Sequence, residues 1–236
     1  MRSRWIHKPI LHTADAGVEK RATRLELFFD LVFVAAFIQL GNGLSKNVTV
    51  VGFLGFAAIF TPLWVAWTGF TFFVNRFTID DIPHRLIVIV QMVTVGAMAM
   101  TAPDVLEGEH FGFSVSYGTA QLLVALHYLR AFKQVEGGRG YSRYWGSVFA
   151  LGGIIWLIAA AVPTPAAYGL WAFGVAIIFV SPFSKHSRAL NEELPLDDEH
   201  LSERYGILTI IVLGETFVKA LSSLTGSGQD PWTLVQ

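Results

Sequence analysis

The chain contains seven apolar windows, each long enough to cross the hydrocarbon core of a membrane as a helix of about 20 residues. Of its 236 residues, 53% are hydrophobic and only 15% are charged, whereas soluble domains carry about 25% charged residues. The sequence therefore predicts an all-α fold, a polytopic integral membrane helix bundle of about seven transmembrane helices. The predicted spans are Leu25–Leu44, Val50–Val74, Arg85–Thr101, Phe113–Phe132, Trp145–Val162, Ala166–Phe183 and Tyr205–Leu224.

Lysine and arginine are distributed unevenly between the two sides of the predicted bundle. Of the 17 basic residues, all but Lys46 and Lys219 lie in residues 1–24 or within and beside the second, fourth and sixth connections. Cytoplasmic loops carry an excess of lysine and arginine. We therefore expect a cytoplasmic N-terminus, with residues 1–24 forming a basic tail and residues 25–236 forming the transmembrane domain in contact with the lipid bilayer.

Several kinds of chemistry have no support in this sequence. With no cysteine, the chain has no disulfide, no thiolate nucleophile and no cysteine-based metal site. It contains no nucleophile–base triad and no HExxH motif, so we expect no enzyme activity and no cofactor. The basic tail is short and its charges mainly set the topology, so no nucleic-acid partner is expected.

Two carboxylates interrupt the first apolar window. Glu26 and Asp30 are four residues apart, so on a helix they share one face at a separation of about 6 Å. The residues around them, Leu27–Phe29 and Leu31–Ile38, are apolar. A carboxylate in such a helix is costly and faces a bundle interior, a partner or water, so both residues are functional-site candidates.

Other charged or titratable side chains fall at a similar depth near the cytoplasmic side. They are Arg24, Asp80, Asp81, His84, Arg85, His127, Arg130, Glu203 and Arg204. These residues admit three interpretations: a structural ion-pair cluster, a water-filled vestibule that receives a cation or proton, or a metal site of Glu26, Asp30, His84 and His127. For the two carboxylates of the first span, we expect Arg24, Arg85 or Arg130 as the partner.

Glu215 lies deeper, twelve residues after Glu203 and so about 18 Å further along the helix. Past the middle of the bilayer, a carboxylate is protonated, paired or exposed to a cavity. Lys219 follows four residues later, which is a favourable spacing for an ion pair. Structural pairing and a role in a transport pathway both remain open for Glu215.

Three segments resemble the bacterial low temperature requirement A (LtrA) proteins. They are RLELFFDLVFVAAFIQL, RFTIDDIPHRLIVIVQM and ERYGILTIIVLGETFVKAL, in that order along the chain. The resemblance implies a multi-pass protein of the bacterial inner (plasma) membrane that is linked to growth at low temperature. Members of this family are typically longer, and the chain stops at Gln236, at the onset of a further apolar segment. We therefore expect a partial chain.

A second, looser resemblance concerns the start of the first span. Arg24, Phe28, Asp30 and Phe33 are similar to the R-x-x-x-F-S-D-G-V-F block of a prokaryotic and lysosomal potassium-channel family. Phe29 and Leu31 replace the serine and the glycine of that block. Arg204 stands at the start of the last span as Arg24 stands at the first, which suggests a six-span repeat that restarts near residue 203.

These observations lead to two main functional hypotheses, and a membrane-embedded enzyme that acts on lipid is a third alternative. In the first, the protein moves a small cation or solute across the membrane, with Asp30 and Glu26 as the cytoplasmic polar site and Glu215 as the deeper candidate. In the second, it is a membrane scaffold or stress-adaptation factor that transports nothing. The sequence leaves the oligomeric state open, a homo-oligomer included.

Overall fold

A computed structural model describes residues 10–11, 23–46, 49–106 and 108–226. The structure confirms the all-α helix bundle. The long helices are α1 (Arg24–Lys46), α2 (Val50–Arg76), α3 (Ile82–Leu106), α4 (Phe111–Gln134), α5 (Arg139–Ala160), α6 (Ala166–Val180) and α8 (Asp198–Gly226). The short elements are β1 (Ile10–Leu11), β2 (Phe77–Thr78), the 3-10 turns η2 (Glu136–Gly138) and η3 (Ser181–Phe183), and α7 (Lys185–Glu193).

Five helical segments among the described residues are long and apolar enough to span a membrane. They are Arg24–Ser45, Val50–Arg76, Ile82–Val105, Glu136–Ala160 and Ala166–Phe183. Each of the seven predicted windows overlaps one long helix, but α4 and α8 fall outside this set. α8 begins with the polar sequence DEHLSER, and α4 carries polar residues along its whole length.

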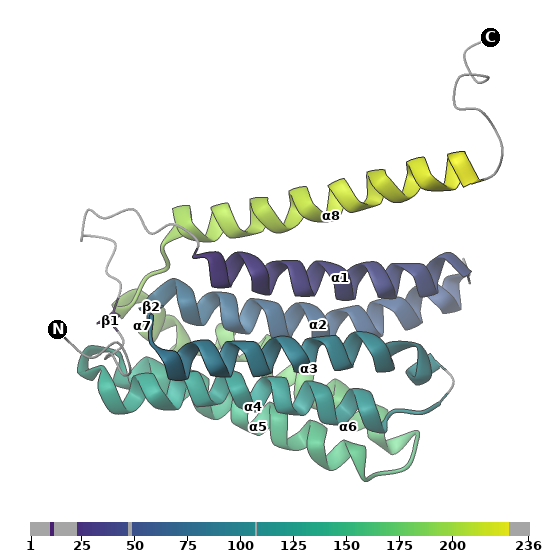
Figure 1. Cartoon of the computed structure of the whole chain (residues 1–236). Coiled ribbons are helices and arrows are strands. Elements are labelled where there is room, and N and C mark those ends of the chain that lie inside the picture. Colours follow the sequence, from purple (N-terminus) through teal and green to yellow (C-terminus); the bar gives the residue numbers. More distant parts are fainter. Residues whose placement is uncertain (1–9, 12–22, 47–48, 107, 227–236) are drawn as a thin grey trace.

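The helices run side by side as a bundle, with α8 along one edge against α1 and α2 (Figure 1). α1 packs against α2 and α3, and α4 packs along α5. Two glycines bring α4 and α5 together. A methyl group on Gly118 would meet the Gly153 carbonyl oxygen at 2.9 Å, and one on Gly153 would meet the Gly118 oxygen at 2.8 Å. Small residues at such crossings allow close backbone approach in membrane helices.

The interior of the bundle is dominated by aromatic side chains. Phe29 and Phe33 of α1 and Trp67, Phe70 and Phe73 of α2 are all completely buried. The ring centroids of Phe29 and Phe70 lie 4.3 Å apart, within the range of favourable aromatic packing. Large apolar side chains also cover the outside of the helices, as a surface in contact with lipid requires.

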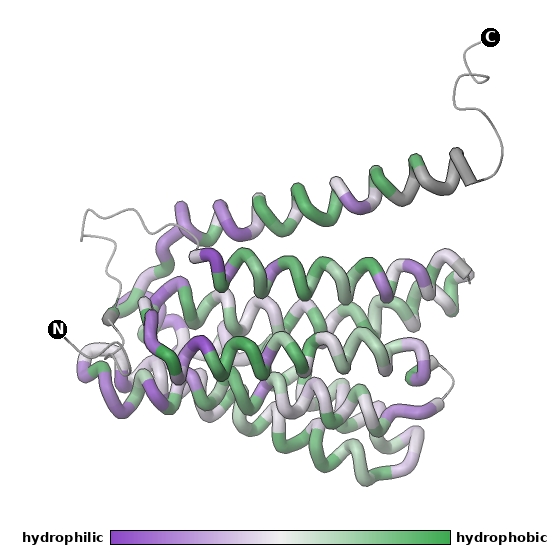
Figure 2. Tube along the Cα trace, viewed as in Figure 1, coloured by the Kyte–Doolittle hydropathy of each residue, from purple (hydrophilic) through white to green (hydrophobic). Residues whose placement is uncertain are grey.

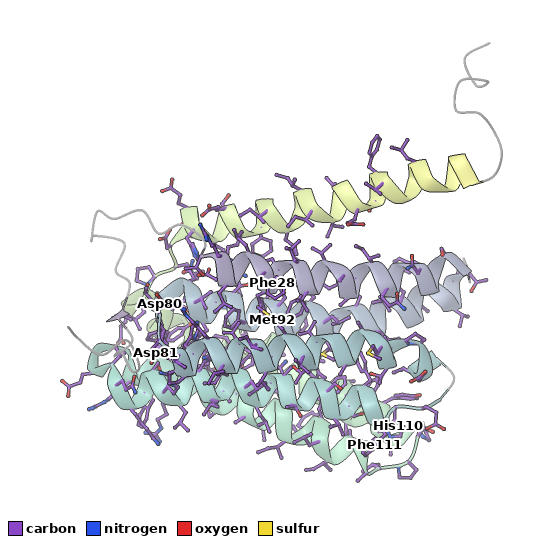
Figure 3. The ribbon with its side chains drawn as sticks, in the orientation of Figure 1. Phe28, Asp80, Asp81, Met92, His110 and Phe111 are labelled. Carbon is purple, nitrogen blue, oxygen red and sulfur yellow. The ribbon has the colours of Figure 1, made fainter. Side chains whose placement is uncertain are left out.

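Polar residues gather at the end of the bundle where α1 and α8 begin (Figure 2). We call this the charged end. Figure 3 shows Asp80 and Asp81 there, and His110 at the opposite end. At the charged end, β1 pairs antiparallel with β2, Ile10 opposite Thr78 and Leu11 opposite Phe77. Most of the predicted basic tail, residues 1–24, lies outside the described residues.

Arg76, the last residue of α2, fixes the short helix α7 at the charged end. Its Nε donates a hydrogen bond to the Leu194 carbonyl oxygen at 3.0 Å, and its Nη2 donates to Asn191 Oδ1 at 2.8 Å. The guanidinium also lies over the Tyr141 ring, 4.5 Å from the ring centroid, where a cation–π interaction is favourable. The α7 segment is thereby connected to α2 and α5 before the chain enters α8.

Candidate functional site

A buried ion-pair cluster joins α1 to α8. The side chains of Asp30 and Arg204 are both 0% exposed. Nη2 of Arg204 donates a hydrogen bond to Asp30 Oδ1, and its Nη1 donates to Glu26 Oε2 at 3.3 Å. One guanidinium thus contacts two carboxylates, which repel each other less in its presence. We call Glu26, Asp30, His200 and Arg204 the α1–α8 cluster.

The indole of Trp67 brings α2 into this cluster. Its Nε1 donates a hydrogen bond to Asp30 Oδ1 at 2.7 Å. The guanidinium carbon of Arg204 lies 5.8 Å from the centroid of the Trp67 ring. Asp30 therefore has a cationic and a neutral donor on the same oxygen. A buried carboxylate needs such partners, because its transfer from water into a low-dielectric interior is strongly unfavourable.

Local capping interactions hold Glu26 in place at the start of α1. Thr23 Oγ1 accepts a hydrogen bond from the Glu26 backbone N–H at 3.2 Å and donates one to Glu26 Oε1 at 3.0 Å. The Thr23 side chain thus caps the N-terminus of α1, as threonine commonly does at this position, and its hydroxyl also holds the Glu26 carboxylate. Oε2 remains directed at His200, whose Nε2 lies 3.3 Å away.

The N-terminus of α8 is fixed to α2 in a similar way. Asp197 Oδ1 accepts a hydrogen bond from the His200 backbone N–H at 3.0 Å. Asn75 Nδ2 donates to the Asp197 carbonyl oxygen at 2.8 Å, and the Asp197 N–H donates to Asn75 Oδ1 at 3.0 Å. This reciprocal pair sets the position from which Arg204 reaches α1.

The predicted cation partners of Glu26 and Asp30 need correction. We expected Arg24, Arg85 or Arg130, but Arg204 makes the contacts to both carboxylates. Arg85 pairs with Asp80 at 2.6 Å and Arg130 pairs with Asp81 at 2.7 Å. These two arginines are engaged by the acidic pair that precedes α3, and Arg24 is exposed at the first turn of α1.

A second polar group lies between α3 and α4. Asp81 Oδ1 accepts the His84 backbone N–H at 2.9 Å, and its Oδ2 accepts Arg130 Nη2. The ring centroids of His84 and His127 are 5.0 Å apart. His127 is 0% exposed and lies among aromatic rings, 5.1 Å from the centroid of Phe73. Within the described part of the chain, neither ring nitrogen of His127 has a hydrogen-bond partner.

A pocket of about 570 Å³ opens at the charged end between α1, the α2–α3 connection and α3. We call it the charged-end pocket. Its charged and titratable lining consists of Arg24, Glu26, Asp80, His84 and Arg85. His84 is therefore shared between this pocket and the buried histidine pair. Asp30 does not line the pocket, so of the two carboxylates on α1 only Glu26 faces it.

The two remaining predicted acids lie on the exposed side of α8. Glu203 and Glu215 are both exposed, whereas Arg204 is completely buried. Glu215 does not line the charged-end pocket. The side chain of Lys219, its predicted partner, lies outside the described residues, so this ion pair stays a prediction.

Among the residues that the structure describes, no group of three or more histidine or acidic side chains is arranged to hold a metal ion. Glu26 and Asp30 face Arg204, whereas His84 and His127 face each other between α3 and α4. The four residues of the metal interpretation thus belong to two separate groups, and an arginine occupies the position that a cation would take beside the carboxylates.

Sequence reasoning missed Trp67 and His200 as members of the site. His200 precedes Arg204 by four residues, so both side chains lie on one face if the segment is a helix. That spacing was a usable signal. Trp67 carries no such signal, because an indole in an apolar helix is ordinarily part of the packing and its hydrogen bond depends on how α1 and α2 pack together.

The bacterial low temperature requirement A (LtrA) protein family matches residues 21–235. The chain belongs to the LtrA family. It is also similar to the uncharacterized protein RA0937 of Rhizobium meliloti, with 28% identity over 227 residues, which cover 92% of this chain and 55% of that protein. The chain thus spans about half the length of this curated relative. No solved structure matches it.

The three segments that carry the LtrA resemblance meet at the charged end. The first supplies Glu26 and Asp30, the second supplies Asp81 and His84, and the third begins at Glu203 and supplies Arg204. The side chains of the first and third segments form the α1–α8 cluster together with His200, and those of the first and second line the charged-end pocket. In this LtrA chain the signature segments therefore build one polar region from α1, α3 and α8.

Proposed function

We propose that this LtrA chain takes part in moving a small cation or solute across the bacterial inner membrane, with the charged end facing the cytoplasm. The observation that carries the proposal is the position of His127. This titratable side chain is completely buried, has no hydrogen-bond partner among the described residues, and lies next to His84 at the wall of a pocket.

An unpartnered polar group in a protein interior is unfavourable, because it loses its hydrogen bonds to water. Ionisable residues within membrane segments commonly mark pathways for ions or protons. A bundle that served only as a scaffold would be more stable with an apolar side chain in the place of His127. The proposed route runs from the charged-end pocket to His84 and then to His127. An imidazole can take up and release a proton, so the cation that we propose for this route is a proton.

The α1–α8 cluster has a different role in this proposal. Arg204 forms ion pairs with the carboxylates of Asp30 and Glu26, and Asp30 does not line the charged-end pocket. Asp30 and Arg204 therefore hold α8 against α1, while Glu26 contributes to both the cluster and the pocket. The full proposal includes seven crossings, a cytoplasmic N-terminus and no enzymatic turnover.

The test is ion flux into proteoliposomes that contain the purified, full natural chain under H⁺, K⁺ or Na⁺ gradients. We expect proton flux above that of empty liposomes in the wild type and a fall to the empty-liposome level in His127→Phe. Phenylalanine fits the aromatic surroundings of His127 but carries no proton. His186→Phe is the matched control, because His186 is exposed on α7, and it should keep the wild-type flux.

The competing function is a non-transporting scaffold, and one observation favours it. The oxygen of Asp30 that faces Arg204 has two donors, so this part of the cluster is sufficient as a structural joint between α1, α2 and α8. A scaffold predicts no flux of any of the three ions from correctly folded protein. It also predicts that His127→Phe raises the thermal stability with no other consequence.

A further inference from the structure

A groove on the outside of the bundle runs between α4 and α5. It has a volume of about 520 Å³ and is separate from the charged-end pocket. Its lining residues are Leu122, Ala125, Leu126, Leu129 and Phe132 of α4, and Ser142, Arg143, Gly146, Ser147 and Ala150 of α5. We call it the α4–α5 groove.

The groove is polar at one end only. Arg143, in the first turns of α5, is exposed and has no ion-pair partner in the part of the chain that the structure describes. Beside it, the hydroxyl of Ser142 is buried and also lacks a hydrogen-bond partner among the described residues. The Ser147 hydroxyl donates to the Tyr144 carbonyl oxygen at 2.7 Å, so its own oxygen still accepts hydrogen bonds. This end offers one free cation and one free hydroxyl donor.

The rest of the groove is apolar and elongated. From Phe132 to Leu122 it follows α4 for ten residues, which corresponds to about 15 Å at the helical rise. Leu126 and Leu129 are exposed on this face, and Gly146 contributes no side chain that would fill the space. A narrow apolar trough of this length matches an extended hydrocarbon chain.

The surrounding charge favours an anionic ligand. Lys133 at the end of α4 and Arg139 at the start of α5 are exposed at the same end of the bundle as Arg143. Arg139 pairs with Glu136 at 3.5 Å, whereas Arg143 itself lines the groove. Basic side chains at this level of a membrane protein attract anionic headgroups, and basic pockets between transmembrane helices bind them.

We propose that the α4–α5 groove is a binding site for an anionic phospholipid. The phosphate contacts the guanidinium of Arg143 and the hydroxyl of Ser142, and one acyl chain lies along Leu129, Leu126 and Leu122. Arginine suits this role because its planar fork donates two hydrogen bonds to a phosphate. The site is independent of the transport proposal, since it shares no residue with the charged-end pocket.

The experiment is native mass spectrometry of the full natural chain in detergent, titrated with phosphatidylglycerol or with phosphatidylcholine of the same acyl chains. We expect the wild type to retain phosphatidylglycerol preferentially, and Arg143→Gln to bind it about fivefold more weakly. Arg188→Gln, which removes an exposed arginine of α7 away from the groove, should bind as the wild type does.

A second variant tests the acyl-chain part without changing any charge. Ala150→Phe places a ring in the apolar trough and should also weaken phosphatidylglycerol binding, with thermal unfolding checked to confirm that the bundle is intact. Equal retention of the two lipids by the wild type would overturn the proposal. Unchanged phosphatidylglycerol binding by either Arg143→Gln or Ala150→Phe would overturn it as well.

Discussion

At the scale of single residues, the defining feature of this chain is a salt bridge closed off from water. Asp30 and Arg204 are completely buried, and Trp67 donates a second hydrogen bond to the same carboxylate. Such a pair contributes little net stability compared with apolar residues of equal volume, because both charges lose their hydration. The removal of one partner is a different matter, since it leaves the other charge buried and alone.

Arg204→Met should therefore destabilise the protein strongly. We expect a loss of about 3–5 kcal/mol in the free energy of unfolding. Asp30 would lose its cationic partner, and Glu26 would lose one of its interactions. Reversible unfolding in mixed detergent micelles measures this loss.

The matched control is Arg85→Met, which breaks the exposed ion pair with Asp80 and should cost less than about 1 kcal/mol. Equal losses in the two variants would contradict a special role for the buried pair.

The acids of this site could be predicted from sequence, but their partner could not. Glu26 and Asp30 stand out as carboxylates in an apolar window, and their spacing gives their shared face directly. Four arginines lie at a similar depth: Arg24, Arg85, Arg130 and Arg204. Which of them pairs with Glu26 and Asp30 depends on which helices are in contact and on which other acids lie nearer to each arginine. Asp80 and Asp81 engage two of them, a competition that only the packing of α3 and α4 decides.

At the scale of helices, the backbones of α4 and α5 approach each other closely. Gly118 and Gly153 each stand where the carbonyl oxygen of the other leaves no space for a side chain. Sequence alone does not distinguish such a glycine from one that faces open space. Gly169 of α6, for example, has no atom within 4 Å of the position that a methyl group would take.

The substitution Gly153→Ala should push α4 and α5 apart or distort both. We expect a cost of about 1–3 kcal/mol, as for other overpacking changes in a tightly packed interior. Gly169→Ala is the same chemical change in a helix with free space, and it should be neutral or slightly stabilising through helix propensity. Thermal unfolding of both variants in one detergent compares them. A Gly153→Ala protein as stable as Gly169→Ala would show that this crossing tolerates a wider separation.

At the scale of the whole molecule, the helical bundle was the most predictable property. Long apolar windows are easily recognised in a sequence, and all seven predicted windows overlap a long helix. Five helical segments are apolar enough to span the membrane on their own composition. α4 and α8 each contribute a cation to the polar region, with Arg130 facing Asp81 and Arg204 facing Asp30.

The orientation can be tested cleanly, because the chain has no cysteine. Glu193→Cys places one thiol at the charged end and Glu109→Cys places one at the opposite end, both at exposed positions. With a cytoplasmic N-terminus, a membrane-impermeant thiol reagent added outside the inner membrane should label Glu109→Cys in intact cells. Glu193→Cys should react only after the membrane is permeabilised. The reverse pattern would place the charged end outside.

The pairing of α1 with α8 also imposes an order on synthesis. Arg204 lies 174 residues after Asp30, so a ribosome that adds about 5–20 residues per second reaches it roughly ten to thirty seconds later. During that interval α1 has been synthesised, but its two carboxylates lack the cation that later pairs with them. Asp30 gains this partner only when the last described helix has been made, so the 174 residues between Asp30 and Arg204 set the earliest time at which the α1–α8 cluster can form.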